Sequence, residues 1–370
     1  MKKTKEINLI MTGGHAKGAA LATFQEITKR KKSWKIYFLG SASSFEGKNI
    51  STLESELFPK LGIKYYAVYT GRVQRKFTRY TIPALLKIPV GFLHSYKLLS
   101  EIKPSVVLSF GGFSAFPVVV IAKLLKVPII IHEQTAVVGR ANRYSYFFAD
   151  KIAISRETSR AYFPDRKIVL TGNPVSDNVL RLKPKTMLGN TPTIFITAGQ
   201  TGSVAINNVI ENSLLTLLSK YKIIHQTGKF QFDKFRDLKA TLDKNLQYKY
   251  VVFSVAEPDL SNYLNKCDIV VSRAGANTVS ELMVLKIPSV LIPLPIAYLD
   301  EQKQNAKYAE KYGIATIIEQ DNLTPKILLS TLNNICGNYS KITESVRFAK
   351  TPDTKASVKL VDLIELVLHE

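Results

Sequence analysis

The chain has 370 residues, a length at which one hydrophobic core rarely suffices, so we expect two domains. Hydrophobic residues make up 46% and charged residues 22% of the chain, which excludes a largely disordered protein. A formal net charge of +22 indicates an anionic partner, such as nucleic acid, phosphate groups or a membrane surface.

The sequence contains few signals for metal binding, disulfides or membrane insertion. Two cysteines cannot build a disulfide framework, and no Cys/His cluster has metal-site spacing, so we expect neither disulfides nor a structural zinc site. The apolar run at 7–11 is too short for a secretory signal, and no run reaches about 18 apolar residues. We therefore expect a protein of the reducing cytoplasm without a transmembrane helix.

Short apolar runs alternate with helix-length amphipathic stretches through the first half of the chain. Their Val, Ile, Tyr and Phe content and their flanking Gly and Pro favour strands. This alternation predicts a parallel sheet covered by helices on both faces. Strands are predicted at 7–11, 35–39, 64–69, 105–110, 127–131 and 151–154, and a helix at 115–126.

A second series of the same kind begins near residue 191, after a breaker-rich stretch at 172–192 that is typical of a linker. Strands are predicted at 193–197, 222–226, 248–253, 268–271, 289–292 and 315–318, and helices at 203–219, 258–266, 277–286, 301–312 and 325–335. We therefore predict an α/β fold of two Rossmann-like, doubly wound domains. Such sheets bind ligands outside the carboxyl ends of their strands, which predicts a cleft between the two domains.

Four glycine-bearing loops follow predicted strands, and each precedes a helix start whose N–H groups suit an anion. Each loop alone could be an ordinary turn, but four at equivalent places favour a function. His15, at the end of the first strand, is a candidate general base. The loops are Thr12-Gly13-Gly14-His15, Gly111-Gly112-Phe113-Ser114, Ala198-Gly199-Gln200-Thr201-Gly202-Ser203 and Ser272-Arg273-Ala274-Gly275-Ala276-Asn277-Thr278.

Two polar runs also follow predicted strands: His132-Glu133-Gln134-Thr135, and the residues from Asp300 to Asn305. Both could be solvated helix starts, and Asp300 has the position of an N-cap.

In this order and spacing, the loops and polar runs resemble the MurG family of bacterial N-acetylglucosaminyltransferases, which belongs to the GT-B glycosyltransferase class. Further matching motifs are Thr171-Gly172-Asn173-Pro174-Val175, His225-Gln226-Thr227-Gly228-Lys229, and Ser272 to Ala276 with Glu281. The match is weak at 40–100, at 180–192 and beyond 320.

The resemblance implies an inverting transferase that uses no metal and no cofactor. It would move N-acetylglucosamine from UDP-N-acetylglucosamine to the C4 hydroxyl of N-acetylmuramic acid in lipid I, the undecaprenyl-diphosphate-linked acceptor. The product would be lipid II, for peptidoglycan synthesis. Residues 1–175 would form the domain that binds the lipid acceptor and the membrane, and 190–345 the donor domain. A helix in 346–370 would pack back on the N-terminal domain.

The resemblance also implies roles for individual residues. His15 would be the catalytic base, with Glu133 as second choice, while Glu281 would bind the ribose hydroxyls. Glycines 111 and 112 and His132 would contact the acceptor and its diphosphate. The donor residues would be Thr12, Gly13, Gly14, Thr135, Gln200, Glu257, Ala276, Asn277, Thr278, Glu281, Gln302 and Asn305.

Three single positions depart from the family pattern: Thr135 stands where Asn is usual, Ser176 where Arg is usual, and Glu301 where His is common. The family also usually has Gly-Gly-Ser-Gln-Gly where this chain has Ala198-Gly199-Gln200-Thr201-Gly202. The change at Ser176 removes a cation that could face the diphosphate, and Arg273 or Lys229 could replace it. Together, the three changes keep open a related lipid glycosyltransferase, such as a diacylglycerol glucosyltransferase.

A polyprenyl-anchored acceptor implies a peripheral enzyme on the cytoplasmic face of the cell membrane, at its anionic inner leaflet. In segment 72–97, cations interleave with apolar residues, which is typical of a membrane-surface site, although the apolar residues could instead be core. The cations are Arg72, Arg75, Lys76, Arg79, Lys87 and Lys97.

Two further function classes remain as alternatives. A UDP-N-acetylglucosamine epimerase would share the architecture, but it would need no lipid acceptor site. A nucleic-acid-binding protein would account for the charge. However, the sequence lacks helix-turn-helix, zinc-finger and RNA-recognition signatures, so we expect no nucleic-acid partner.

Overall fold

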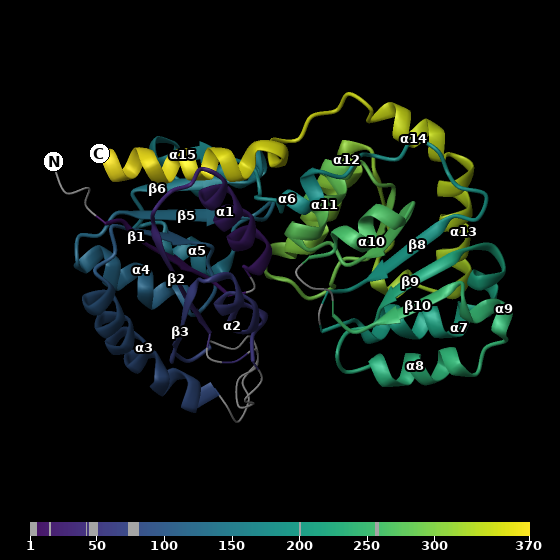
Figure 1. Ribbon diagram of the computed structural model, residues 1–370, viewed down its shortest axis with the longest axis horizontal. Helices are drawn as coiled ribbons and strands as arrows, with labels where there is room; N and C mark the ends of the chain where they lie inside the picture. The colour runs from purple at the N-terminus through teal and green to yellow at the C-terminus, as the bar shows by residue number, and fades with distance from the viewer. Residues whose placement is uncertain are drawn as a thin grey trace. The chain divides into compact units, whose positions relative to one another are not determined.

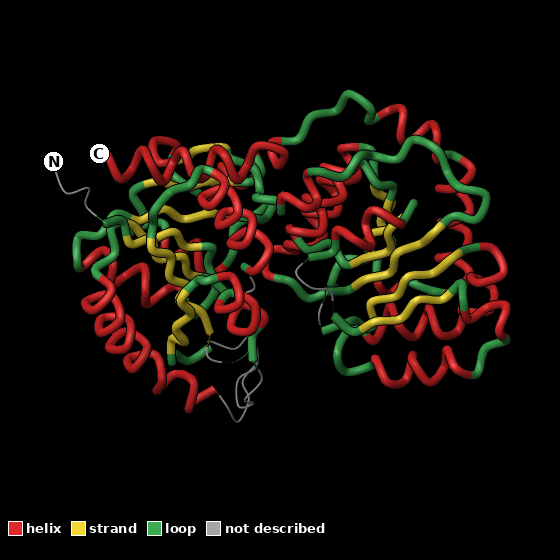
Figure 2. The backbone as a smooth tube through the Cα atoms, viewed as in Figure 1, coloured by secondary structure: helices red, strands yellow, loops and turns green. Residues whose placement is uncertain are grey.

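The computed structural model describes residues 6–14, 16–41, 43, 51–72, 81–199, 201–255 and 259–370. The chain forms two compact units: unit 1 combines Met1–Val175 with Pro352–Glu370, and unit 2 comprises Ser176–Thr351. In each unit, strands and helices alternate along the chain (Figure 2). Both sheets are parallel in all their strand pairs, which confirms the predicted fold class.

Unit 1 is built on a seven-stranded sheet of order β3-β2-β1-β4-β5-β6-β7. The central position of β1 places the loop after Thr12 beside the loop after Ser109, because these residues are register partners. The prediction missed β7, a half-buried strand of three residues. The strands are β1 Asn8–Thr12, β2 Lys35–Ser41, β3 Lys64–Val68, β4 Val106–Ser109, β5 Ile129–Glu133, β6 Lys151–Ile154 and β7 Ile168–Leu170.

Helices cover the sheet of unit 1 (Figure 1). The α-helices are α1 Lys17–Lys29, α2 Leu53–Leu57, α3 Thr81–Ile102, α4 Ala115–Leu124, α5 Arg140–Ser145 and α15 Ala356–His369. The 3-10 helices are η1 Pro59–Leu61, η2 Glu157–Tyr162, η3 Asp165–Lys167 and η6 Pro352–Lys355.

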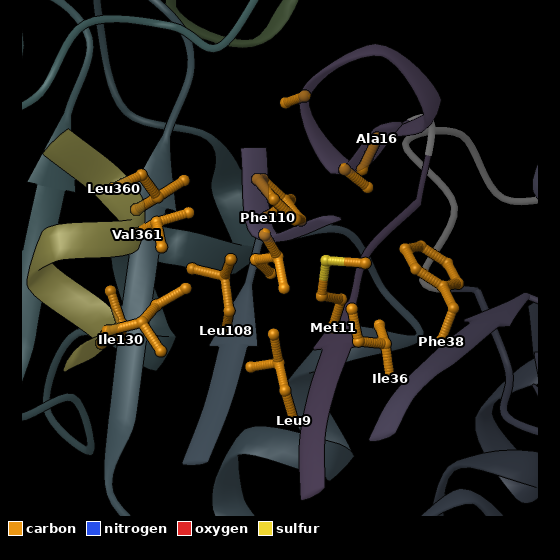
Figure 3. Packing of buried hydrophobic residues seen from close by; sticks show 14 of the residues in the cluster. Leu9, Met11, Ala16, Ile36, Phe38, Leu108, Phe110, Ile130, Leu360 and Val361 are labelled. Carbon is orange, nitrogen blue, oxygen red and sulfur yellow. The ribbon is translucent and has the colours of Figure 1, made fainter. Parts of the chain in front are cut away.

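Alternate residues along the strands of unit 1 belong to two different apolar clusters, one on each face of the sheet. Leu9 and Met11 belong to one cluster, whereas Ile10 belongs to the other, as the period of two of a strand requires. Leu360 and Val361 of α15 belong to the same cluster as Leu9 (Figure 3). Thus, residues from the far end of the sequence complete the core of the first unit.

Helix α15 lies beside α1 (Figure 1). A charged side chain at the end of α1 also contacts α15. Arg30, just after α1, donates to Asp362 Oδ1 at 2.7 Å and to the carbonyl of Val358 at 3.0 Å. Polar contacts at the rim therefore fix the helix in addition to its apolar face.

Unit 2 contains a six-stranded sheet of order β10-β9-β8-β11-β12-β13 around one apolar cluster. Its strands are β8 Thr193–Thr197, β9 Lys222–Gln226, β10 Tyr250–Phe253, β11 Ile269–Ser272, β12 Ser289–Leu291 and β13 Ala315–Ile317. Its α-helices are α6 Asp177–Leu180, α7 Val204–Lys220, α8 Phe232–Ala240, α9 Lys244–Gln247, α10 Ser261–Lys266, α11 Ala276–Leu285, α12 Glu301–Tyr312, α13 Pro325–Gly337 and α14 Tyr339–Ser345, with 3-10 helices η4 Tyr298–Asp300 and η5 Gln320–Asn322.

Lysines occupy a position after several helices where glycine is usual. Lys31, Lys126 and Lys286 follow α1, α4 and α11 with φ of 52°, 58° and 55°. The N–H groups of Lys126 and Val127 donate to the carbonyls of Lys123 and Ala122, which is the Schellman pattern. These lysines place positive charge at helix C-termini, where the helix dipole is negative.

None of the helices in the described ranges combines the length and the apolarity that crossing a membrane requires.

Candidate functional site

The two glycine loops of unit 1 pack against each other. The N–H of Gly14 donates to the carbonyl of Gly111 at 3.0 Å. A Cβ on Gly112 would lie 2.7 Å from the Gly14 nitrogen, and Gly111 and Gly112 have φ of 81° and 95°. Glycine is therefore needed at position 112 for the approach of two backbones. The predicted base His15, next to this contact, lies outside the described residues.

Thr12, a predicted donor-binding residue, is fully buried. Its hydroxyl donates to the carbonyl of Leu39 at 2.7 Å. This bond ties the end of β1 to β2.

The Glu133 side chain organises the loop that follows β5. One carboxylate oxygen accepts from the N–H and the hydroxyl of Thr135 at 3.0 and 2.9 Å. The other accepts from the Gly139 N–H at 2.8 Å and from Asn142 Nδ2 at 3.0 Å. Burial raises the pKa of Glu133, and these hydrogen bonds oppose the shift. The Thr135 hydroxyl also lies 3.0 Å from the carbonyl of Val137. The N–H and the hydroxyl of Thr135 are therefore both engaged within this loop.

His132, predicted at the acceptor, is fully buried behind the loop after β4. Its Nε2 lies 3.0 Å from the carbonyl of Gly172, and its ring packs edge-on against Phe110. Burial lowers its pKa to about 4, so the imidazole is neutral near pH 7.

A buried ion pair secures the segment that begins with Gly172. Asp353 accepts from Arg156 Nη1 at 2.6 Å and from the Asn173 N–H at 2.8 Å. A Cβ on Gly172 would lie 2.6 Å from Pro352, so the two chain segments that leave unit 1 lie side by side. Asp353 was absent from the predicted site, because only the folded chain brings it to Arg156.

Unit 2 repeats the close packing of two loops. A Cβ on Gly202 would lie 2.1 Å from the Thr227 carbonyl, and one on Gly228 would lie 2.4 Å from the Gly202 nitrogen. Asn207 Nδ2 donates to the same Thr227 carbonyl at 3.0 Å. The predicted donor residue Gln200 lies outside the described residues.

His225 is linked to this loop pair through Asn207. Its Nδ1 lies 2.9 Å from the Tyr250 hydroxyl, and its Nε2 lies 3.1 Å from Asn207 Oδ1. Burial lowers the pKa of His225 to about 3, which keeps the ring neutral.

Four of the residues predicted to bind the donor lie on α11, among them Glu281, which was predicted to bind the ribose. Ala276, Asn277 and Thr278 form its first turn and are partly exposed. Glu281, also partly exposed, lies further along the same helix. The structure thus brings these four residues together at the carboxyl edge of the sheet, after β11.

Arg273, between β11 and α11, joins several loops of this edge. Nη1 donates to the carbonyls of Ile292 and Pro293, at 3.1 Å each. Nη2 donates to Ser203 Oγ at 2.7 Å and to Gln320 Oε1 at 2.6 Å. By contrast, Lys229 is exposed.

Gln302 and Asn305, predicted to hold the sugar, both lie on α12 and both contact neighbouring loops. Gln302 Oε1 accepts from the Leu294 N–H at 3.0 Å, and Asn305 Nδ2 donates to the Ala274 carbonyl at 3.2 Å. Asp300 does not act as an N-cap by its side chain, since it has a φ of 51° and makes no such bond. Leu299, with a φ of 52°, shares this left-handed conformation.

Ser176, where the family pattern has Arg, donates to Asp259 Oδ2 at 2.8 Å. Asn178 Nδ2 donates to the same oxygen at 3.1 Å. Burial acts to raise the pKa of Asp259, but hydrogen bonds from Ser261, Ser176 and Asn178 outweigh it and lower the pKa. The predicted residue Glu257 lies outside the described residues.

Within the described ranges, no three His, Cys, Asp or Glu side chains are grouped so that they could hold a metal ion.

Family models match both units of the chain. Residues 10–154 match the glycosyltransferase family 28 N-terminal domain, and residues 193–361 match the glycosyltransferase family 28 C-terminal domain.

Two relatives carry the same name, UDP-N-acetylglucosamine--N-acetylmuramyl-(pentapeptide) pyrophosphoryl-undecaprenol N-acetylglucosamine transferase. The relative from Lachnoclostridium phytofermentans is 32% identical over 367 residues, which cover 97% of this chain and 98% of the relative. The relative from Legionella pneumophila strain Lens is 31% identical over 373 residues, which cover 98% and 97%.

Solved structures share the fold over nearly the whole chain. MurG of Acinetobacter baumannii superposes with a TM-score of 0.70 at 25% identity and covers 97% of this chain and 99% of its own. A putative UDP-N-acetylglucosamine 2-epimerase from Listeria monocytogenes reaches a TM-score of 0.65, covering 97% and 96%. Its identity is only 11%, so that likeness concerns the fold alone.

Proposed function

Because this chain belongs to the MurG family within glycosyltransferase family 28, we propose that it transfers N-acetylglucosamine from UDP-N-acetylglucosamine to lipid I. The main support for this proposal is sequence identity: the chain is 31–32% identical, over nearly the full length of both chains, to relatives that are named for this activity. The acceptor is the C4 hydroxyl of N-acetylmuramic acid, and the product is lipid II for peptidoglycan.

We assign the donor to unit 2 and the acceptor to unit 1. The partly exposed Glu281 is suited to accept hydrogen bonds from two ribose hydroxyls. Gln302 and Asn305 order the loops around the sugar through Leu294 and Ala274. The carboxyl edge of the unit 1 sheet, at the Gly111-Gly112 loop, would take the acceptor.

An inverting displacement needs a base on the attacking hydroxyl, and we assign that role to His15. Glu133 suits the role less well, because four protein donors occupy its buried carboxylate. His132 is better suited to support the acceptor loop than to touch the diphosphate, since it is fully buried and neutral.

The test is UDP release by the purified protein with UDP-N-acetylglucosamine, with and without a lipid I analogue. We expect release that depends on the acceptor and is slower with UDP-glucose. Release with diacylglycerol in place of the analogue would assign the protein to a different lipid glycosyltransferase. Interconversion of the donor's C2 epimers without any acceptor would indicate an epimerase instead.

We further propose that α3 holds the protein at the cytoplasmic face of the membrane. One face of α3 packs inward through Leu98, Leu99 and Ile102. Another carries strongly exposed apolar side chains, including Leu86 and Leu93 at 72% each. Lys87 and Lys97 lie on the same helix, and cations next to exposed apolar residues suit an anionic lipid surface.

Sedimentation with phosphatidylglycerol vesicles tests this surface. The double substitution Leu86→Ser with Leu93→Ser should reduce vesicle binding about tenfold, because two large apolar groups no longer enter the lipid. As a matched control, Leu215→Ser on α7 changes a side chain that is 63% exposed and should leave binding unchanged. Equal binding by the double variant would refute the membrane role of α3.

A further inference from the structure

Asp353 joins parts of unit 1 that lie far apart in the sequence. Its side chain is buried, and Oδ1 accepts from Arg156 Nη1 at 2.6 Å and from the Asn173 N–H at 2.8 Å. These partners lie 197 and 180 positions away. A buried ion pair adds little net stability, because desolvation of the two charges offsets their attraction. The bond to the backbone of Asn173 therefore points to a further role for the carboxylate.

The peptide group between Gly172 and Asn173 is held on both sides. Asp353 accepts from its N–H, and its carbonyl oxygen lies 3.0 Å from His132 Nε2. The N–H and C=O of one peptide group lie in a plane and point in opposite directions. Fixing the direction of the N–H therefore also fixes the direction of the carbonyl. Gly172 has a φ of 88°, and a Cβ there would lie 2.6 Å from Pro352, so the neighbouring backbone adds to this constraint.

This peptide group sets the state of the His132 ring. A carbonyl oxygen only accepts, so the bond to Gly172 places the ring hydrogen on Nε2. Burial lowers the pKa of His132, so the ring is neutral near pH 7 and Nδ1 carries a lone pair. Nδ1 is buried, and no described residue forms a hydrogen bond with it. The Ser155 hydroxyl lies 3.5 Å from Nε2, too far for a strong bond. The orientation of the ring thus depends mainly on Gly172.

The His132 ring in turn supports the loop after β4. It packs edge-on against Phe110, with the ring centroids 5.6 Å apart. Phe110 is buried and directly precedes Gly111 and Gly112. Buried side chains are closely packed, so a turned imidazole would displace Phe110 or leave a void beside it. The position of the two glycines therefore depends on the His132 ring.

We propose that Asp353 is a positioning residue for the acceptor site. Its carboxylate orients the peptide group between Gly172 and Asn173. That group orients the His132 ring, and the ring supports the loop after β4. Arg156 balances the charge of the carboxylate and is not itself needed for the positioning. The inference rests on the proposed function, which assigns the acceptor to this loop.

Two double variants separate the hydrogen bond from the ion pair. Arg156→Met with Asp353→Asn removes both charges, but the new amide oxygen can still accept from the Asn173 N–H. Arg156→Met with Asp353→Leu removes both charges and this acceptor. Neither variant leaves an unpaired charge in the interior, as a single substitution would.

Steady-state kinetics with UDP-N-acetylglucosamine and a lipid I analogue measure the effect. For the leucine double variant we expect KM for the analogue to rise about tenfold, because small displacements of binding groups are costly. KM for the donor should change less than about twofold in both double variants, and the asparagine double variant should also keep KM for the analogue within about twofold. Equal KM values for the analogue in the two variants would overturn the proposal, as would a parallel rise for donor and analogue.

A control variant tests whether lost stability alone explains the result. Ile129 is fully buried at the start of β5 and belongs to the apolar cluster that does not contain Phe110. Ile129→Ala should destabilise unit 1 by opening a cavity, yet leave KM for the analogue unchanged. A rise in that KM equal to the rise in the leucine double variant would show that Asp353 has only a structural role.

The His132 ring provides a readout that does not depend on turnover. In spectra of ¹⁵N-histidine-labelled protein, the shifts of the two ring nitrogens report which one carries the hydrogen. The chain has five histidines, and His132→Gln identifies the signals of interest. We expect the Nε2–H form in the unmodified protein and in the asparagine double variant, and altered ring signals in the leucine double variant. Unaltered signals in the leucine double variant would overturn the proposal. Absence of sugar transfer by the unmodified protein would instead refute the proposed function, whatever the tautomer of His132.

Discussion

At the scale of single residues, Glu133 shows how a motif can support a site without reacting. Both carboxylate oxygens accept two hydrogen bonds each from the loop that they face. In Glu133→Gln an NH₂ group would replace one of these oxygens, so two of the donors would lose their acceptor. We expect the free energy of unfolding to fall by about 1–3 kcal/mol. Turnover should fall without a change in its pH profile. Loss of one limb of that profile would instead identify Glu133 as the base.

Lys126 gives a second prediction at this scale. Its φ of 58° is unfavourable for any residue with a Cβ. Lys126→Gly should therefore raise the free energy of unfolding by about 1 kcal/mol in urea titrations. Leu124→Gly, two residues earlier in helical conformation, should lower it by a similar amount. Destabilisation by both substitutions would show that the lysine contributes more than its backbone costs.

At the scale of elements, α15 belongs to the core of unit 1 although it follows the whole of unit 2. Ile364 is fully buried, so Ile364→Ala should destabilise unit 1 by about 2–5 kcal/mol. Leu366→Ala, at a half-exposed position, should change stability by less than about 0.5 kcal/mol. Hydrogen exchange would assign the loss, since amides of β1 and β4 should exchange faster while those of β8 keep their protection. Faster exchange in β8 alone would contradict this assignment.

The sequence predicted most elements because their patterns are local. Strands β8 and β9 have the predicted bounds, Thr193–Thr197 and Lys222–Gln226, since breakers or charges flank each apolar run. Strand β7 was missed because three half-buried residues carry too little pattern. In the candidate site, the sequence predicted polar loops at strand ends. It could not predict the bonds of Arg273 to Ser203 and Gln320, partners 70 and 47 positions away.

At the scale of the whole molecule, the described part of each unit contains a fully buried histidine, His132 in unit 1 and His225 in unit 2. Burial lowers their pKa values to about 4 and about 3, whereas an unfolded histidine titrates near ~6.5. Below that pH, these two histidines bind protons in the unfolded chain but stay neutral in the folded chain. The stability that the two neutral histidines allow is fully present above about pH 6.5, and it is lost progressively as the pH falls toward 4.

Both units should therefore weaken in mild acid, by about 1 kcal/mol per histidine at pH ~5.5. Urea titrations between pH 7.5 and 5.5 measure this slope. His225→Gln should reduce it for unit 2, while His369→Gln, at an exposed position, should leave it unchanged. An unaltered slope in His225→Gln would mean that this histidine is not the group that titrates.

The place of α15 in the sequence also has a consequence for biosynthesis. A ribosome finishes every residue of unit 2 before it makes Pro352, with which the second part of unit 1 begins. All residues of unit 2 are therefore synthesised before the last segment of unit 1. Unit 1 lacks Leu360, Val361 and Ile364 until later, and its nascent sheet meanwhile exposes Leu9 and Met11 to the surroundings. The domain that is begun first thus has a core that only the last residues to be synthesised can complete.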